Sequence, residues 1–79
     1  MEYFDPEHLY PGDLVASNYA GNILGRIVCR RPDWGSWFEP VYVIQCLHAD
    51  STTNYSYRAI VPVEDMFVRY ARWVRSRNG

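Results

Sequence analysis

The stretch Pro11–Val28, PGDLVASNYAGNILGRIV, contains two apolar runs on either side of a polar turn at Asn18–Asn22. Runs rich in β-branched and aliphatic residues, bounded by Pro, Gly and Asn, are typical of a β-hairpin. We therefore expect strands over residues 13–17 and 23–30. This hairpin predicts a mainly β fold, in which the later strands pack against these two.

Gly25 interrupts the second expected strand. A glycine inside a strand often marks a bulge or a bend, so we predict an irregularity at this position. Alternation along the strand then predicts that Ile27 and Cys29 point inward. The side chains expected to point outward are Arg26, Val28 and Arg30.

Two further strands are expected over residues 41–48 and 54–60. The first, beginning Val-Tyr-Val-Ile, is nearly continuous in apolar residues, which favours a central strand covered on both sides. Tyr42, Ile44, Cys46 and His48 share one face of it, which we expect to be core or core edge. The second alternates, with Tyr55, Tyr57 and Ala59 on one face. Polar residues between these two runs predict a second hairpin.

The sequence after the second hairpin fits two structures. Residues 61–65, VPVED, predict a tight connecting turn because Pro62 cannot donate a ladder hydrogen bond. Residues 67–70 alternate as a strand, yet apolar residues from Met66 to Val74 also fit helical spacing. We favour a fifth strand at 67–70, with a short C-terminal helix as the alternative.

The length and composition of the chain predict one small folded domain. Its 79 residues are 48% hydrophobic and 16% aromatic, which excludes the low-hydrophobicity composition of disordered chains. We expect an N-terminal arm at residues 1–10 whose aromatic side chains cover one opening of the fold, a barrel domain at 11–74, and a flexible tail at 75–79.

The net charge and the cysteines of the chain indicate which partners and which cellular compartment to expect. Nine acidic and eight basic residues give a net charge of −1, so the molecule as a whole has no field that attracts nucleic acid or an anionic membrane. The first residues, MEYFDPEH, lack the pattern of a secretory signal, so we expect a cytoplasmic protein with reduced thiols at Cys29 and Cys46. The longest apolar run, Val41–Ile44, is too short to span a bilayer.

No pattern in the sequence indicates catalysis or metal binding. Four residues have the chemistry of zinc ligands, but none are paired at the close spacing of a C-x₂-C motif: His8, Cys29, Cys46 and His48. The residue types of an acyl-transfer triad also occur, without a nucleophile turn: Ser36, His48 and Asp50. We therefore expect no catalytic residues, no metal and no cofactor.

An aromatic segment is the best candidate for a functional site. Residues 31–40 are expected to form a loop, because they contain Pro and Gly, yet they also hold three large aromatic side chains. Exposed aromatic residues flanked by arginine are frequent in protein interfaces. The alternative for each single Trp is that it folds back over a thin core. The expected partner-binding residues are Tyr19, Arg30, Arg31, Trp34, Trp37 and Phe38.

Two other interpretations remain open. The same aromatics could stack on nucleobases while arginines contact phosphates; the arginines concerned are Arg69, Arg72 and Arg75. A solvated face is the interpretation we favour for that stripe, because nearby acidic residues reduce the local positive charge. The aromatic patch could instead be a homodimer interface.

The order PGDLV, GNILGRIV, an aromatic loop, VYVIQC, a hairpin and VPVEDM resembles the SH3-like small β-barrels of bacterial and phage proteins, including the KOW type. In those barrels a Pro-Gly-Asp enters the first strand, a glycine shapes the second, and a single 3₁₀ turn precedes the last. The resemblance covers residues 11–70 and implies a single five-stranded SH3-like barrel. The acidic and aromatic motif with which eukaryotic SH3 domains bind proline-rich peptides is absent, so that ligand is not carried over.

Two functional expectations follow from the aromatic segment and from the resemblance. The first is a non-catalytic adaptor or inhibitor that binds another protein, of the kind that phages and mobile elements encode. The second, implied by the KOW type, is a nucleic-acid-binding barrel associated with transcription or translation.

Overall fold

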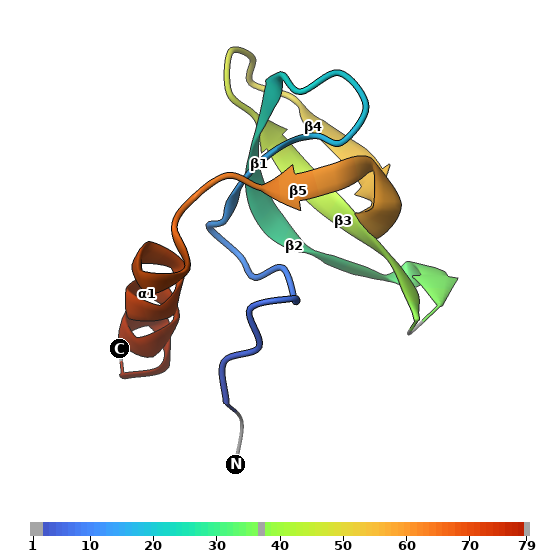
Figure 1. The fold of residues 1–79 in the computed structure, drawn as a ribbon. Helices are drawn as coiled ribbons and strands as arrows, with labels where there is room; N and C mark the ends of the chain where they lie inside the picture. Colours follow the sequence, from blue (N-terminus) through green and yellow to red (C-terminus); the bar gives the residue numbers. More distant parts are fainter. Residues whose placement is uncertain (1–2, 37, 79) are drawn as a thin grey trace.

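In the computed structural model, which describes residues 3–36 and 38–78, the chain forms one antiparallel sheet and a C-terminal helix (Figure 1). The elements in chain order are β1 (Leu14–Ser17), β2 (Ile23–Ser36), β3 (Glu39–Cys46), β4 (Thr52–Ser56), the 3₁₀ turn η1 (Tyr57–Ala59), β5 (Ile60–Pro62) and α1 (Met66–Asn78). The strand order is β4-β3-β2-β1-β5, so the first and last strands are neighbours. The predicted mainly β class is confirmed.

The predicted β1–β2 hairpin is present, and Gly25 lies at the irregularity predicted for it. Val15 pairs with Gly25, but the next residue, Ala16, pairs with Ile23, so the register shifts by one residue at this point. A Cβ atom on Gly25 would collide with the carbonyl oxygen of Gln45 on β3. Glycine is therefore required here because β3 approaches the backbone of β2 closely.

A second register shift corrects the orientation predicted for Cys29. Ile27 pairs with Ile44 and Cys29 pairs with Val43, which leaves Val28 as an extra residue on β2. One extra residue moves every following side chain to the opposite face. Ile27 is buried as predicted, but Cys29 is exposed, so its predicted inward orientation is wrong.

The core is small and draws on β1, β2, β3 and β5 of the sheet. Tyr42 and Ile44 are buried as predicted. Leu9 reaches the same cluster from the N-terminal segment. The buried hydrophobic cluster consists of Leu9, Val15, Ile27, Tyr42, Ile44 and Ile60.

The strand predicted at 54–60 is instead a strand followed by a turn. β4 ends at Ser56, whose side-chain oxygen accepts a hydrogen bond from the backbone nitrogen of Arg58 at 3.4 Å. This cap begins η1, which turns the chain so that Ile60 can pair with Ser17 of β1. The fifth strand is therefore β5, at residues where we predicted the end of a strand and a connecting turn.

The fifth strand predicted at 67–70 is wrong, and the helical alternative is confirmed. Asp65 precedes α1, and its Oδ1 accepts a hydrogen bond from the backbone nitrogen of Phe67 at 2.7 Å, which satisfies a free N–H group at the start of the helix. β5 already pairs with β1, so residues 67–70 cannot pair with that edge of β1. The helix continues through residues 75–78, most of the segment for which we expected a flexible tail.

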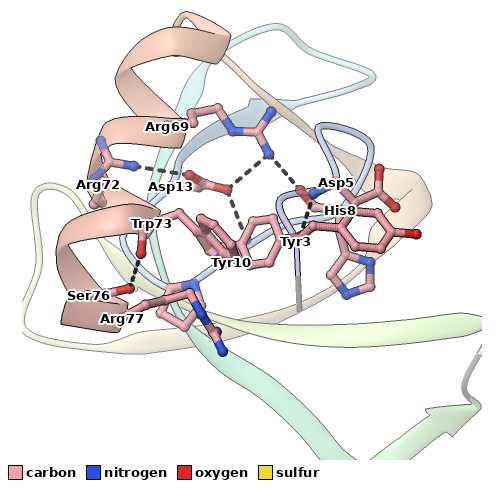
Figure 2. Close-up of a pocket in the computed structure, with 11 residues that line it drawn as sticks. Tyr3, Asp5, His8, Tyr10, Asp13, Arg69, Arg72, Trp73, Ser76 and Arg77 are labelled. Atoms are coloured by element: carbon pink, nitrogen blue, oxygen red, sulfur yellow. Dashed lines mark hydrogen bonds and ion pairs between the residues drawn. The ribbon is translucent and has the colours of Figure 1, made fainter. Parts of the chain in front are cut away.

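Helix α1 is fixed to the sheet by a buried carboxylate at the entrance to β1. Asp13 and Arg69 are only 2% and 4% exposed, and Asp13 Oδ2 lies 3.2 Å from Arg69 Nη2. Asp13 Oδ1 lies 3.0 Å from Arg72 Nη1, and Asp13 Oδ2 also accepts a hydrogen bond from the backbone nitrogen of Tyr10 at 2.9 Å. Two arginines of the helix and one backbone amide therefore converge on one buried side chain, as Figure 2 shows for the side chains.

Glu64 extends this cluster toward β1. Both of its carboxylate oxygens lie 2.7 Å from Arg72 Nη2, and Oε1 also accepts a hydrogen bond from the backbone nitrogen of Leu14. Partial burial by itself raises the pKa of Glu64. The hydrogen bonds from Arg72 and Leu14, together with the positive charges of Arg72 and Arg26, outweigh that effect and leave its pKa below the ordinary value.

The N-terminal arm packs against α1 through backbone carbonyl groups and an aromatic side chain. Arg69 Nη1 donates to the carbonyl oxygen of Pro6 at 3.0 Å, and Nη2 donates to that of His8 at 2.6 Å. The Phe4 ring lies 5.6 Å from that of Tyr70 and 5.9 Å from that of Trp73, both on the helix. The arm and the helix therefore stabilise each other.

Within the described residues, no helix combines the length and the apolarity that crossing a membrane requires.

We expect Asp13→Asn to lower the free energy of unfolding by about 3–5 kcal/mol, because it leaves Arg69 buried without its counter-charge. Urea denaturation followed by far-UV circular dichroism measures this loss. Asp33→Asn, which removes an exposed carboxylate that is also paired with an arginine, should leave stability nearly unchanged.

If Asp13→Asn fails to fold, the double variant Asp13→Asn/Arg69→Met provides the second measurement. Removing the orphaned charge should restore part of the lost stability. Equal stability of wild type and Asp13→Asn would contradict the role assigned to this carboxylate.

Candidate protein-binding surface

The segment predicted as an aromatic loop is the end of a long β2–β3 hairpin. β2 continues to Ser36 and β3 begins at Glu39, so the prediction of a loop over residues 31–40 is wrong for most of its length. Figure 1 shows this end of the hairpin extending beyond the rest of the sheet. Arg30 pairs with Tyr42 but Gly35 pairs with Pro40, which leaves residues 31–34 as a bulge.

The bulge contains a pre-arranged cluster of charged and aromatic side chains. Arg31 and Asp33 form two hydrogen bonds, from Nε to Oδ1 at 3.0 Å and from Nη2 to Oδ2 at 2.7 Å. These hydrogen bonds raise the pKa of Arg31 and lower that of Asp33 from their ordinary values. The Arg31 guanidinium also lies over the Trp34 ring, 4.6 Å from its centre, so both side chains are held in place before any partner arrives.

Four of the predicted partner-binding residues present large or charged side chains at the surface. Trp34 is 51% exposed, Phe38 61% and Tyr19 81%, and Arg30 is also exposed on β2. Trp37 lies outside the described residues. Trp34 and Phe38 come from the same end of the hairpin, whereas Tyr19 lies on the β1–β2 turn.

A groove lies beside this end of the hairpin. Its volume is about 250 Å³, which suits one or two side chains of a partner rather than a whole small molecule. Phe38 and Pro40 of the hairpin form part of its wall, and Tyr57 of η1 and Pro62 of β5 form another part. The lining residues are Glu7, His8, Leu9, Phe38, Pro40, Tyr42, Tyr57, Ile60 and Pro62.

Arg58 connects the β1–β2 turn with the hairpin, a role that no sequence pattern indicated. Its Nη2 lies 2.7 Å from Glu39 Oε1, and its carbonyl oxygen accepts a hydrogen bond from Asn18 Nδ2 at 3.1 Å. Arg58 Nε also donates to the Tyr57 hydroxyl at 3.2 Å, an interaction that raises the pKa of the arginine. Asn18, the neighbour of Tyr19, is thereby linked through Arg58 to Glu39 at the end of the hairpin.

The arginines proposed as nucleic-acid contacts do not form an exposed stripe. Arg69 is buried and Arg72 is half-buried, and both are paired with Asp13. Of these three arginines only Arg75 is exposed. The solvated face that we favoured for this stripe is therefore wrong at Arg69 and Arg72.

A larger cavity, of about 640 Å³, lies between the N-terminal arm and α1 (Figure 2). Its cationic side chains already have partners, because Arg69 and Arg72 bind Asp13 and the Arg77 guanidinium lies 5.0 Å from the centre of the Trp73 ring. A ligand there would have to compete with the contacts that hold the helix. We therefore place the candidate functional site at the hairpin and its groove, although that groove is smaller.

Across residues 3–36 and 38–78, no three His, Cys, Asp or Glu side chains come together where they could share a metal ion.

We expect Gly35→Ala to destabilise the protein more than Gly21→Ala. Both glycines have a left-handed backbone, with φ of 72° and 78°, so each substitution costs about 1–2 kcal/mol from backbone strain alone. A Cβ atom at Gly35 would also collide with the carbonyl oxygen of Glu39, whereas at Gly21 it would meet no atom within 4 Å. Urea denaturation of the two variants checks this difference; equal losses would show that the turn of the hairpin is looser than described.

Comparison of the chain with protein-family models, with curated proteins and with solved structures finds no match. The proposal for function therefore depends on the geometry of the hairpin, the groove and the side chains around them.

Proposed function

We propose that this protein is a non-catalytic protein-binding module, acting as an adaptor or inhibitor, and that the β2–β3 hairpin with its groove is the binding surface. The observation that carries this proposal is the exposure of Trp34 and Phe38 on a projecting hairpin beside a groove lined by aromatic and proline side chains. Large aromatic side chains contribute most to the free energy of binding when they enter a pocket on the partner and lose their contact with water.

The order of the bulge supports binding to a protein. Arg31 is held by Asp33 and lies over Trp34, so little side-chain freedom remains to be lost on association. Arg and Trp are also the residue types most enriched among the side chains that dominate protein interfaces. The groove beside Phe38 can accept an apolar side chain of the partner. Arg58 and Glu39, which neighbour the lining residues Tyr57 and Pro40 in the sequence, are exposed and offer polar contacts.

We also propose that the sheet is an SH3-like small barrel. The strand order, which places β5 beside β1, supports this assignment, as does the 3₁₀ turn η1 immediately before β5. The groove is lined by residues of both the β2–β3 hairpin and η1.

The nucleic-acid alternative has less support. Arg69 and Arg72 are already paired with Asp13, and the Arg31 and Arg58 side chains form ion pairs with Asp33 and Glu39. Phosphate binding requires a local excess of positive charge, which these acidic partners reduce.

Affinity capture with matched baits tests the proposed surface. The immobilised wild-type protein is compared with Trp34→Ala/Phe38→Ala and with Tyr3→Ala, in nuclease-treated lysate of the native host, by quantitative mass spectrometry. We expect at least one protein to be retained by wild type and by Tyr3→Ala but lost by at least tenfold with the double variant. Tyr3 is the control because it is an 82% exposed aromatic on the arm, away from the hairpin.

Two outcomes would contradict the proposal. Retention of the same proteins by the double variant would exclude the hairpin as the binding surface. Binding of a labelled single-stranded oligonucleotide that weakens steeply with salt and falls with Arg75→Ala would favour the nucleic-acid alternative.

A further inference from the structure

Strand β4 is one edge of the sheet, and within the described residues no strand pairs with its outer side. Proteins usually shield the unpaired N–H and C=O groups of an edge strand with charges, proline, a bulge or a very short strand. The other edge, β5, has only three residues and ends in Pro62, which has no N–H. β4 has five residues without charge or proline, and its register with β3 is unbroken. It is therefore the more accessible edge.

The hydrogen bonds at the start of β4 show which of its backbone groups face outward. The backbone nitrogen of Cys46 donates to the carbonyl oxygen of Ser51 at 3.0 Å. Opposite residues in an antiparallel pair alternate between hydrogen-bonded and non-hydrogen-bonded pairs, so Thr53 is the next residue of β4 that bonds to β3. The N–H and C=O groups of Thr52 and Asn54 therefore point away from β3, toward the free edge.

The core-facing side of β4 is also open at this edge. Thr53 pairs with Ile44, whose side chain is fully buried. Tyr55 pairs with Tyr42, which is buried as well, so both β4 residues lie on the core face of the sheet. Thr53 is nevertheless exposed and Tyr55 only half-buried. Free backbone groups beside an uncovered core face fit an extended segment in which apolar residues alternate.

The groove of the proposed binding surface adjoins this edge. Tyr42, directly opposite Tyr55, lines the groove, and so does Tyr57, which follows β4 in η1. A protein that fills the groove is therefore beside β4. A second copy of this chain is a poorer occupant, because each β4 would contribute Tyr55 as its single large apolar side chain. Five residues per copy also bury far less than the roughly 1,000 Å² that a stable interface requires.

We propose that an extended segment of the protein partner adds to the sheet beside β4, as a further strand paired with Thr52 and Asn54. This inference rests on the proposed function, because the hairpin and the groove supply the rest of the interface. The segment has apolar residues at alternate positions, placed so that they cover Thr53 and Tyr55. Its backbone hydrogen bonds contribute affinity, and its alternate side chains contribute specificity.

Amide hydrogen exchange and a matched pair of proline variants test whether the edge is free. In the wild-type protein the N–H groups of Thr53 and Tyr55 should exchange slowly and that of Asn54 rapidly. Asn54→Pro should retain the fold, since proline is tolerated where the N–H of an edge strand faces solvent. Thr53→Pro removes a hydrogen bond to β3 and should destabilise the protein severely. Slow exchange at Asn54 in the free protein would contradict the assignment.

Peptides selected from a phage-displayed library of random linear sequences are the probe for binding. We expect the enriched peptides to have alternating apolar residues and to slow the exchange of the Asn54 N–H when bound. Asn54→Pro should weaken their binding about tenfold or more, because hydrogen bonds at the edge are lost. Asn54→Ser keeps the N–H and should bind like the wild type. Thr52→Pro gives the second measurement if Asn54→Pro does not fold.

The same peptides separate this inference from the proposed function. Peptides that lose affinity with Asn54→Pro but not with Trp34→Ala/Phe38→Ala would support pairing at β4 and count against the hairpin. The reverse pattern would overturn pairing at β4 and leave the hairpin proposal in place. A selection without any peptide that is sensitive to Asn54→Pro would also overturn pairing at β4.

Discussion

The buried carboxylate of Asp13 determines how the C-terminal third of the chain is arranged. It receives Arg69, Arg72 and the backbone amide of Tyr10 at the point where the chain enters β1. A buried charge of this kind is tolerated only when it is paired and hydrogen-bonded, because removing a carboxylate from water is costly. The helix must therefore bring its arginines to Asp13, and this requirement fixes which side of α1 faces the sheet.

Two features of the molecule follow from that constraint. Because the arginine side of α1 faces inward, Phe67 and Ala71 remain exposed, and Tyr70 is half exposed with its ring against that of Phe4 in the arm. The same inward arginines hold the N-terminal arm through the carbonyl oxygens of Pro6 and His8, which positions Leu9 in the core beside the groove. The hairpin at the other end of the sheet is free of this cluster, and its own ion pairs order its aromatic side chains.

Local patterns predicted the elements that depend on local chemistry. The β1–β2 hairpin and the core positions Tyr42 and Ile44 were predictable, because turn residues and apolar runs specify them directly. The orientation of Cys29 was not predictable, because Val28 is one extra residue in β2 and moves Cys29 to the opposite face of the sheet. β5 has only three residues and is extended because it pairs with β1. Three residues are too few for an alternation of apolar and polar side chains to identify a strand.

The candidate site was predictable in part. The aromatic residues of the hairpin were recognised from composition, but Arg58 and Glu39 meet only because η1 redirects the chain after β4. Likewise, the side of α1 that is buried depends on Asp13, more than fifty positions earlier in the sequence. Helical spacing predicted that the apolar residues from Met66 to Val74 could form a helix. It did not predict that Phe67 and Tyr70 would remain exposed on that helix.

The orientation of α1 is the central claim, and side-chain NMR of the wild-type protein tests it most directly. We predict nuclear Overhauser contacts from the Arg69 side chain to Asp13 and to residues of the arm, together with slow solvent exchange of the Arg69 guanidinium protons. Contacts from Phe67 or Val74 to the core residues of the sheet, with rapid exchange at Arg69, would show that the helix packs by its apolar side and would contradict the account.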